Sequence, residues 1–226
     1  MKRAYLLYGI VVSLFALTGC GKHAGDYEQP TISGGLSFEH NPSGDWQVGY
    51  SADTSLALDM FRLSTYADTS NIIGVWHPAS GPSGYYPYVA QNRDTVTRVE
   101  PNGHWAARSG QLAMEASGTG QYSIVRYVVP VSGRYVLSAT FEGIHYNLSS
   151  TDVHILMNAT HLLDDQIDGY GGDPAYHAIT GTHPSSSYRD TLQLQQHDIL
   201  TFAVGYGANK TNYNDTNGLL VWLERL

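Results

Sequence analysis

Short runs of alternating apolar residues, interrupted by Gly, Pro, Asn and Ser, restrict the fold of this chain more than any other feature. At 135–141 and again at 152–157, apolar side chains occupy every second position. A period of two gives a β-strand one buried face and one solvated face. Clusters of turn-forming residues, such as 41–44 and 132–133, separate these runs from their neighbours. The pattern therefore predicts many short strands joined by tight turns.

Helical patterns are nearly missing between these runs. Twelve segments carry the strand pattern: 36–40, 46–50, 56–64, 72–77, 95–100, 111–116, 122–130, 134–142, 152–158, 191–195, 199–205 and 219–223. Strands that follow one another without helices form antiparallel sheets, which bury their apolar faces against each other. The sequence therefore predicts an all-β fold, a two-sheet antiparallel β-sandwich of the jelly-roll type, as one domain over 31–226.

The first 20 residues have the order of a secretory signal peptide. Two basic residues precede an apolar stretch over 6–17, and small residues then lead to Cys20. The apolar stretch is shorter than the roughly 20 residues that a transmembrane helix needs. We therefore expect a signal peptide at 1–19 and, at 20–30, a polar tether that begins with the cysteine.

The ending Leu17-Thr18-Gly19-Cys20 resembles the signal of bacterial lipoproteins, which are cut before the cysteine and lipidated on its thiol. The resemblance implies lipidation of Cys20 and attachment to a membrane of the bacterial cell envelope. Gly21 after the cysteine implies the outer membrane. Because Cys20 is the only cysteine of the chain, the domain is expected to contain no disulfide.

The net charge excludes some classes of partner. It falls from −8 to −10 when residues 1–19 are removed, because Lys2 and Arg3 carry the only charges of that segment. An acidic surface repels nucleic acid and anionic lipid headgroups. We therefore expect no nucleic-acid partner, and membrane attachment only through the N-terminal lipid.

Five phrases in the mature chain resemble bacterial secreted β-sandwich domains of the carbohydrate-binding-module or galactose-binding-like type. The phrases are FEHNPSGDWQVGY at 38–50, VRYVVPVSGRY at 125–135, TDVHILMN at 151–158, LTFAVGYG at 200–207 and DTNGL at 215–219. The resemblance spans 36–223 and implies a glycan-binding sandwich. It offers no catalytic residue to transfer.

Aromatic residues are the first candidates for a binding site. Flat rings stack on the C–H faces of sugars, and neighbouring polar groups bind the hydroxyls. Three tyrosines directly follow the Gly/Pro/Ser-rich segment 80–84, and three tryptophans lie near Gly, Pro or His. The candidates are Tyr85, Tyr86, Tyr88, Trp46, Trp76 and Trp105. The same rings could instead fill the core of the sandwich.

Acidic residues are the second candidates, as ligands of a structural calcium ion. Asp164, Asp165, Asp168 and Asp173 lie within ten residues that also contain three glycines, and calcium takes six to eight oxygen ligands. The segment does not match an EF-hand loop, and a solvated loop is the alternative. The resemblance to sandwich modules adds Glu39 and Asp215, where the first and last strands meet.

Motifs for nucleophilic catalysis and phosphate binding are missing, since Gly-x-Ser-x-Gly does not occur and the glycines at 118–120 lead into a strand. The ten histidines have no metal-binding spacing and are expected at the surface. Glycoside hydrolysis needs only two carboxylates, and nothing local selects a pair. The sequence therefore predicts a lipid-anchored, non-catalytic envelope module that binds glycans. A protein-binding adhesion module, and a polysaccharide-acting hydrolase or lyase, stay open.

Overall fold

The computed structural model describes residues 31–226 except 54, 56, 68 and 79–84. The predicted signal peptide, Cys20 and the tether lie outside the described residues. The described chain contains 16 strands and one five-residue helix, α1 (Thr31–Gly35). No helix among these residues is long and apolar enough to cross a membrane.

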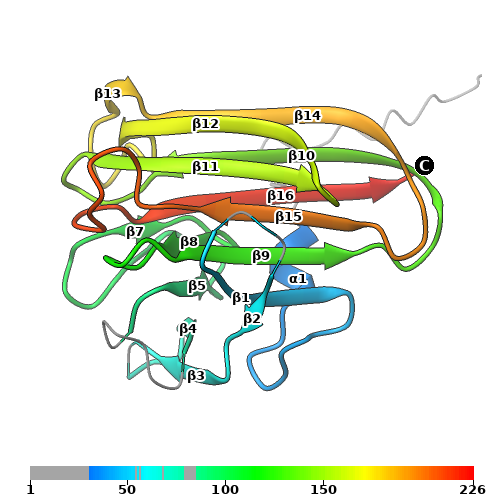
Figure 1. The fold of residues 1–226 in the computed structure, drawn as a ribbon. Helices are drawn as coiled ribbons and strands as arrows, with labels where there is room; N and C mark the ends of the chain where they lie inside the picture. The colour runs from blue at the N-terminus through cyan, green and yellow to red at the C-terminus, as the bar shows by residue number, and fades with distance from the viewer. Residues whose placement is uncertain (1–30, 54, 56, 68, 79–84) are drawn as a thin grey trace, which may run out of the picture.

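Two antiparallel sheets, each of seven described strands, face each other as a sandwich (Figure 1). Sheet A has the order β13 (Thr180–His183), β12 (Thr160–Tyr170), β11 (Ser149–Met157), β15 (Ile199–Val204), β9 (Tyr122–Val128), β1 (Trp46–Ser51), β2 (Asp59–Met60). Sheet B has the order β14 (Ser185–Leu194), β10 (Gly133–Gly143), β16 (Asn217–Arg225), β8 (Leu112–Glu115), β5 (Tyr88–Asn92), β4 (Ile73–His77), β3 (Leu63–Tyr66). A small third sheet pairs β6 (Arg98–Val99) with β7 (Ala106–Ala107).

The strand order confirms the predicted jelly roll. From β8 to β16 the chain crosses repeatedly between the sheets, so that the order β14-β10-β16-β8 faces the order β12-β11-β15-β9. This is the arrangement of two interleaved Greek keys. Strands β1 to β5 extend both sheets beyond this unit at one side.

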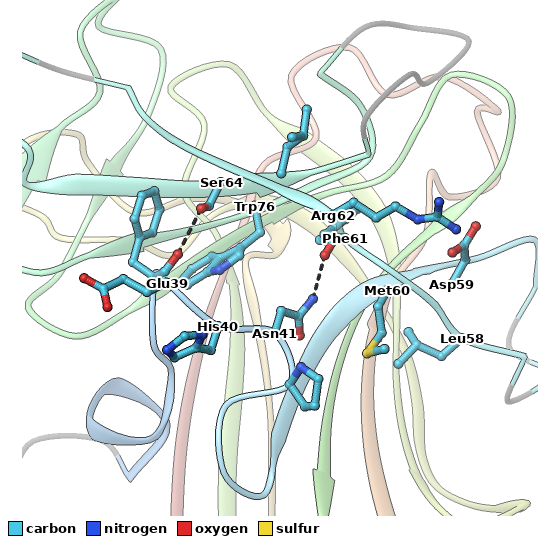
Figure 2. A pocket seen from close by; sticks show the side chains of 13 residues that line it. Glu39, His40, Asn41, Leu58, Asp59, Met60, Phe61, Arg62, Ser64 and Trp76 are labelled. Atoms are coloured by element: carbon cyan, nitrogen blue, oxygen red, sulfur yellow. Dashed lines mark hydrogen bonds between the residues drawn. The ribbon is translucent and has the colours of Figure 1, made fainter.

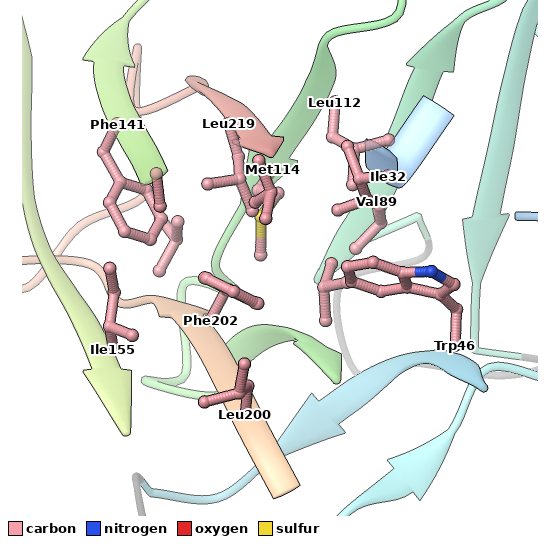
Figure 3. Close-up of a cluster of buried hydrophobic side chains, with 14 of the residues drawn as sticks. Ile32, Trp46, Val89, Leu112, Met114, Phe141, Ile155, Leu200, Phe202 and Leu219 are labelled. Atoms are coloured by element: carbon pink, nitrogen blue, oxygen red, sulfur yellow. The ribbon is translucent and has the colours of Figure 1, made fainter. Parts of the chain in front are cut away.

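Alternating side chains from both sheets form the core. Phe141 of β10 and Leu219 of β16 point inward from sheet B, and Ile155 of β11 and Phe202 of β15 meet them from sheet A (Figure 3). All four are fully buried. Burial of one such side chain stabilises the fold by about 1.5–3 kcal/mol. The period-two pattern of the sequence is thus the pattern of the core.

Several expected elements differ from the structure, among them the segment 95–100, which contains only the two-residue strand β6. The segment 36–40 forms no strand, because Phe38 packs instead on the rings of Tyr66 and Trp76, at 4.4 and 5.5 Å. The segment 56–64 contains the separate short strands β2 and β3. The acidic segment expected as a turn or loop is mostly strand β12, because backbone pairing with β11 continues to Gly169. Asp164, Asp165 and Asp168 therefore stand on a sheet, whereas Asp173 follows the end of β12.

Candidate functional site

A pocket with a volume of about 1090 Å³ lies beside β5 and β8. We call it the aromatic pocket. Three stretches between strands close it, around 100–105, 145–147 and 212–216. Its lining residues are Ala67, Val75, Tyr85, Tyr86, Tyr88, Glu100, Asn102, His104, Trp105, Glu115, His145, Asn147, Asn212, Tyr213, Asn214 and Thr216.

Tyrosines at the pocket differ in depth. Tyr213 is 81% exposed and Tyr85 is 50% exposed, so part of each side chain is accessible to a ligand. Tyr85 is held in place by its stacked contact with His77, with ring centroids 4.5 Å apart, and by a hydroxyl contact of 3.2 Å to Thr65 Oγ1. Tyr86 is half-buried, and its ring centre lies 5.6 Å from that of the buried Tyr88. Exposed and buried tyrosine rings thus line the same pocket.

Glu115 lines the pocket and is buried. Its Oε2 accepts hydrogen bonds from the hydroxyls of Tyr88, at 3.0 Å, and Thr216, at 2.6 Å. Burial raises the pKa of the Glu115 carboxyl from its ordinary 4.5 to about 8. At pH 7 the Glu115 side chain is therefore largely a neutral carboxylic acid.

Amide and imidazole groups line the rest of the pocket. Asn102 Nδ2 donates to Glu100 Oε1 at 2.6 Å, and Asn147 Nδ2 donates to Asn214 Oδ1 at 3.2 Å. Burial lowers the pKa of His145 from its ordinary value, so this ring is largely neutral at pH 7. Such groups can donate and accept hydrogen bonds without carrying charge.

The six aromatic residues predicted from the sequence occupy different places. Tyr85, Tyr86, Tyr88 and Trp105 all line the aromatic pocket, although Trp105 is only 5% exposed. Trp46 belongs to the main core (Figure 3), where its ring centre lies 4.9 Å from that of Tyr127. For Trp46, burial favours the alternative role of filling the core.

Trp76 is only 2% exposed and belongs to the main core, and it also lines a second pocket of about 700 Å³, between the N-terminal segment and the strands β2 and β3. Figure 2 shows Asn41 in this pocket, where its side chain donates to the carbonyl of Phe61 at 2.9 Å. Glu39 lies at the same pocket. The structure thus places Trp76 and Glu39 together, apart from the residues that line the aromatic pocket.

The four aspartates predicted as calcium ligands do not converge on one point through their contacts. Three of them accept hydrogen bonds from hydroxyl groups of different segments: Asp165 from Ser186, Asp168 from Thr182 and Asp173 from Thr97. The fourth, Asp164, contacts two histidines instead. The proposed role of these residues as calcium ligands stays a prediction.

Asp215 is fully buried, whereas Glu39 lies at the pocket of Figure 2. Asp215 Oδ1 accepts the backbone N–H of Ser150 at 2.8 Å, and burial raises the pKa of its carboxyl to about 7. The hydrogen bonds of the described residues do not link Asp215 to Glu39. Calcium binding by this pair also stays a prediction.

Most residues of the aromatic pocket escaped the sequence analysis, among them Tyr213, Glu115, Asn102, Asn147 and Asn214. Tyr213 stands in the polar stretch 209–217, where a single aromatic residue among Asn and Thr was the available signal. Glu115 comes from an apolar strand, and its partner Thr216 lies 101 residues further along the chain. No local pattern joins residues so far apart.

Comparisons with known proteins leave the family open. No family model matches the chain, and no curated protein matches it. A solved structure described as "CBM4 structure and function" aligns with 78% of this chain and 100% of its own, at 12% identity and a TM-score of 0.32. A family 35 carbohydrate binding module from Clostridium thermocellum aligns with 73% of this chain and 98% of its own, at 11% identity and a TM-score of 0.31.

A β-glucosidase from Kluyveromyces marxianus in complex with glucose aligns with 72% of this chain, at 15% identity and a TM-score of 0.29. The alignment covers 16% of the enzyme, so this chain spans only a small part of that protein's length. Likenesses this weak carry no conclusion about ligand or reaction. The aromatic pocket has to be interpreted from its own residues.

Proposed function

We propose that the aromatic pocket binds a glycan and that the protein is a non-catalytic binding module. The observation that carries this proposal is the meeting of exposed Tyr85 and Tyr213 with the amides of Asn102, Asn147 and Asn214 in one pocket. Sugars present apolar C–H faces and many hydroxyls, which match aromatic rings and neutral polar groups respectively.

The charges of the pocket favour a neutral glycan. None of the described lining residues is Lys or Arg, which are the residues that pair with carboxylate or sulfate groups of acidic sugars. Glu100 is acidic, and Glu115 is largely neutral at pH 7. The volume, about 1090 Å³, exceeds that of common small-ligand sites of about 300–1,000 Å³. A neutral oligosaccharide fits these properties best.

A glycan array with the full chain, followed by calorimetric titration of each hit, tests this proposal. Loss of one stacking ring removes about 1–2 kcal/mol of binding free energy, so Tyr85→Ala and Tyr213→Ala should each weaken binding about tenfold. Tyr176→Ala is the matched control, because Tyr176 is 42% exposed and does not line the pocket. A hit that survives the double variant, or no neutral glycan hit, contradicts the proposal and favours a protein partner.

Glycoside hydrolysis is the second candidate, because two carboxyl groups line the same pocket. A protonated carboxylic acid beside an ionised carboxylate is the pair that such enzymes use, and Glu115 has the raised pKa of the acid. Release of reducing sugar from the array hits would establish this candidate, provided that Glu115→Gln abolishes it. Binding without release supports the binding module.

The cellular location of the protein forms part of the same proposal. The ending Leu-Thr-Gly-Cys at Cys20, preceded by two basic residues and an apolar stretch, supports a lipid anchor in the bacterial envelope. Gly21 supports the outer membrane as the site of attachment. Such an anchor would hold the aromatic pocket close to a glycan-rich surface.

A further inference from the structure

The hairpin of β11 and β12 carries a cluster of histidine and aspartate side chains that the glycan proposal does not use. One ligand atom each from His154, His161 and Asp164 lies within 4.8 Å of the others. None of the three lines the aromatic pocket. The cluster therefore needs an explanation of its own.

A β-bulge brings the two histidines to one face. His154 pairs with Asp164 and Ile155 with Leu163, but Leu156 then pairs with His161, so the register shifts by one residue. In a regular strand, His161 and Asp164 would point to opposite faces, because three residues separate them. The bulge reverses the face of His161 and places it beside Asp164.

Asp164 lies between the two imidazoles. Its Oδ1 is 2.5 Å from His154 Nδ1 and 2.7 Å from His161 Nδ1. The side chains of His161 and Asp164 are 45% and 51% exposed, whereas that of His154 is only 15% exposed. Two of the three groups are thus free to adjust around a fixed third.

Asp152 fixes the orientation of His154 by contacting Nε2, the ring nitrogen that does not face Asp164. Its Oδ2 is 2.8 Å from His154 Nε2 and accepts the hydroxyl of Tyr122 at 2.7 Å, while its Oδ1 accepts the N–H of Gly207 at 2.7 Å. The carboxylate lies over Gly205, where a Cβ atom would come within 2.3 Å of Oδ1. Histidines that bind metals usually donate their other ring N–H to such a positioned carboxylate.

We propose that His154 Nδ1, His161 Nδ1 and a carboxylate oxygen of Asp164 bind a divalent transition-metal ion of the zinc class, with Asp152 as the partner that orients His154. Imidazole nitrogen and carboxylate oxygen are preferred zinc ligands, and three protein ligands leave a fourth position for water. Calcium is not expected here, because it binds oxygen rather than nitrogen.

Two of the three separations between ligand atoms require only a small movement. Ligand atoms of a tetrahedral zinc site lie about 3.3 Å apart, given metal–ligand distances of about 2.0–2.1 Å. The present separations of 2.5 and 2.7 Å must therefore open by less than 1 Å. The side chains of Asp164 and His161 are exposed and have room for this change, and the third separation, between the two imidazole nitrogens, is within 4.8 Å.

Calorimetric titration of Zn²⁺ into the full chain tests the proposal. The protein is purified without a polyhistidine tag and treated with a chelator beforehand. We expect saturable binding of one ion per chain, a rise in Tm with Zn²⁺, and loss of both in His161→Ala and in Asp164→Asn. His183→Asn is the matched control, because His183 is similarly exposed and pairs with a single aspartate, Asp165, at 3.0 Å.

Two further measurements separate a metal site from a simple ion-pair cluster. Imidazole ¹⁵N spectra should show Zn²⁺ on Nδ1 of His154 and His161, with His154 Nε2 still protonated. Asp152→Asn should weaken binding by about 10–100-fold without abolishing it, as expected for a carboxylate that orients a ligand. Absence of saturable binding, or equal binding by the His161→Ala variant, would overturn the proposal.

Discussion

Replacing Glu115 by Gln should change how the stability of this protein depends on pH. The pKa of the Glu115 carboxyl is about 8 in the folded protein, against an ordinary value of 4.5. Between these pH values the folded protein keeps a proton that the unfolded chain has released, so the free energy of unfolding falls as pH rises. The stabilising contribution is complete below pH 4.5 and is lost as pH rises through about 8.

The magnitude follows from the difference between the two pKa values. At about 1.36 kcal/mol for each pH unit, this difference corresponds to about 5 kcal/mol lost between pH 4.5 and pH 8. Gln keeps an acceptor for the hydroxyls of Tyr88 and Thr216 but does not ionise. The variant should therefore gain stability over the wild type as pH rises, by up to about 5 kcal/mol.

Urea unfolding of both proteins at several pH values from 5 to 8.5 measures this difference. Asp215, whose pKa is also raised, to about 7, is present in both proteins, so the comparison removes the part of its contribution that does not depend on the Glu115 charge. Glu224→Gln, at the exposed end of β16, is the matched control and should follow the wild-type profile. If the difference in free energy of unfolding between Glu115→Gln and the wild type does not change with pH, the conclusion that Glu115 is a buried neutral acid is refuted.

Two further predictions concern the anchor and the sheet. Cys20→Ser should abolish incorporation of labelled fatty acid and release the protein from the membrane fraction, and retention in that fraction would contradict lipidation. Gly205→Ala should destabilise the fold by about 1–3 kcal/mol in urea unfolding, because the added Cβ would meet Asp152 Oδ1 at 2.3 Å. Gly34→Ala is its control, since nothing lies within 4 Å of a Cβ at that position, and equal destabilisation by both variants would contradict the close contact at Gly205.

The fold could be predicted from the sequence because each strand carries its own signal. In β10, the inward positions Tyr135, Leu137, Ala139 and Phe141 are all buried, as the period of two requires. Strand β12 escaped prediction because aspartates occupy several of its positions, including Asp165, which is satisfied by Ser186 at 2.6 Å. In the sequence alone, a strand whose polar residues form hydrogen bonds across a sheet has the same composition as a turn.

The candidate sites could be predicted only where their residues lie close together in the sequence. Tyr85, Tyr86 and Tyr88 reach the same pocket because they are neighbours in the chain. Tyr88 and Glu115 are 27 residues apart, and only the pairing of β5 with β8 joins them. The position of His161 depends on a β-bulge. The bulge changes the face of the sheet to which the side chain points, but it leaves no signal in the composition of the strand.

Glycan binding in the aromatic pocket is tested most directly by an NMR titration with a neutral oligosaccharide selected on the array. Spectra of the ¹⁵N-labelled full chain should show shifts at the backbone amides around Tyr85, Asn102, Asn147 and Tyr213, which saturate with the calorimetric affinity. Shifts confined to the pocket of Figure 2, or spread over the surface without saturation, would contradict glycan binding in the aromatic pocket.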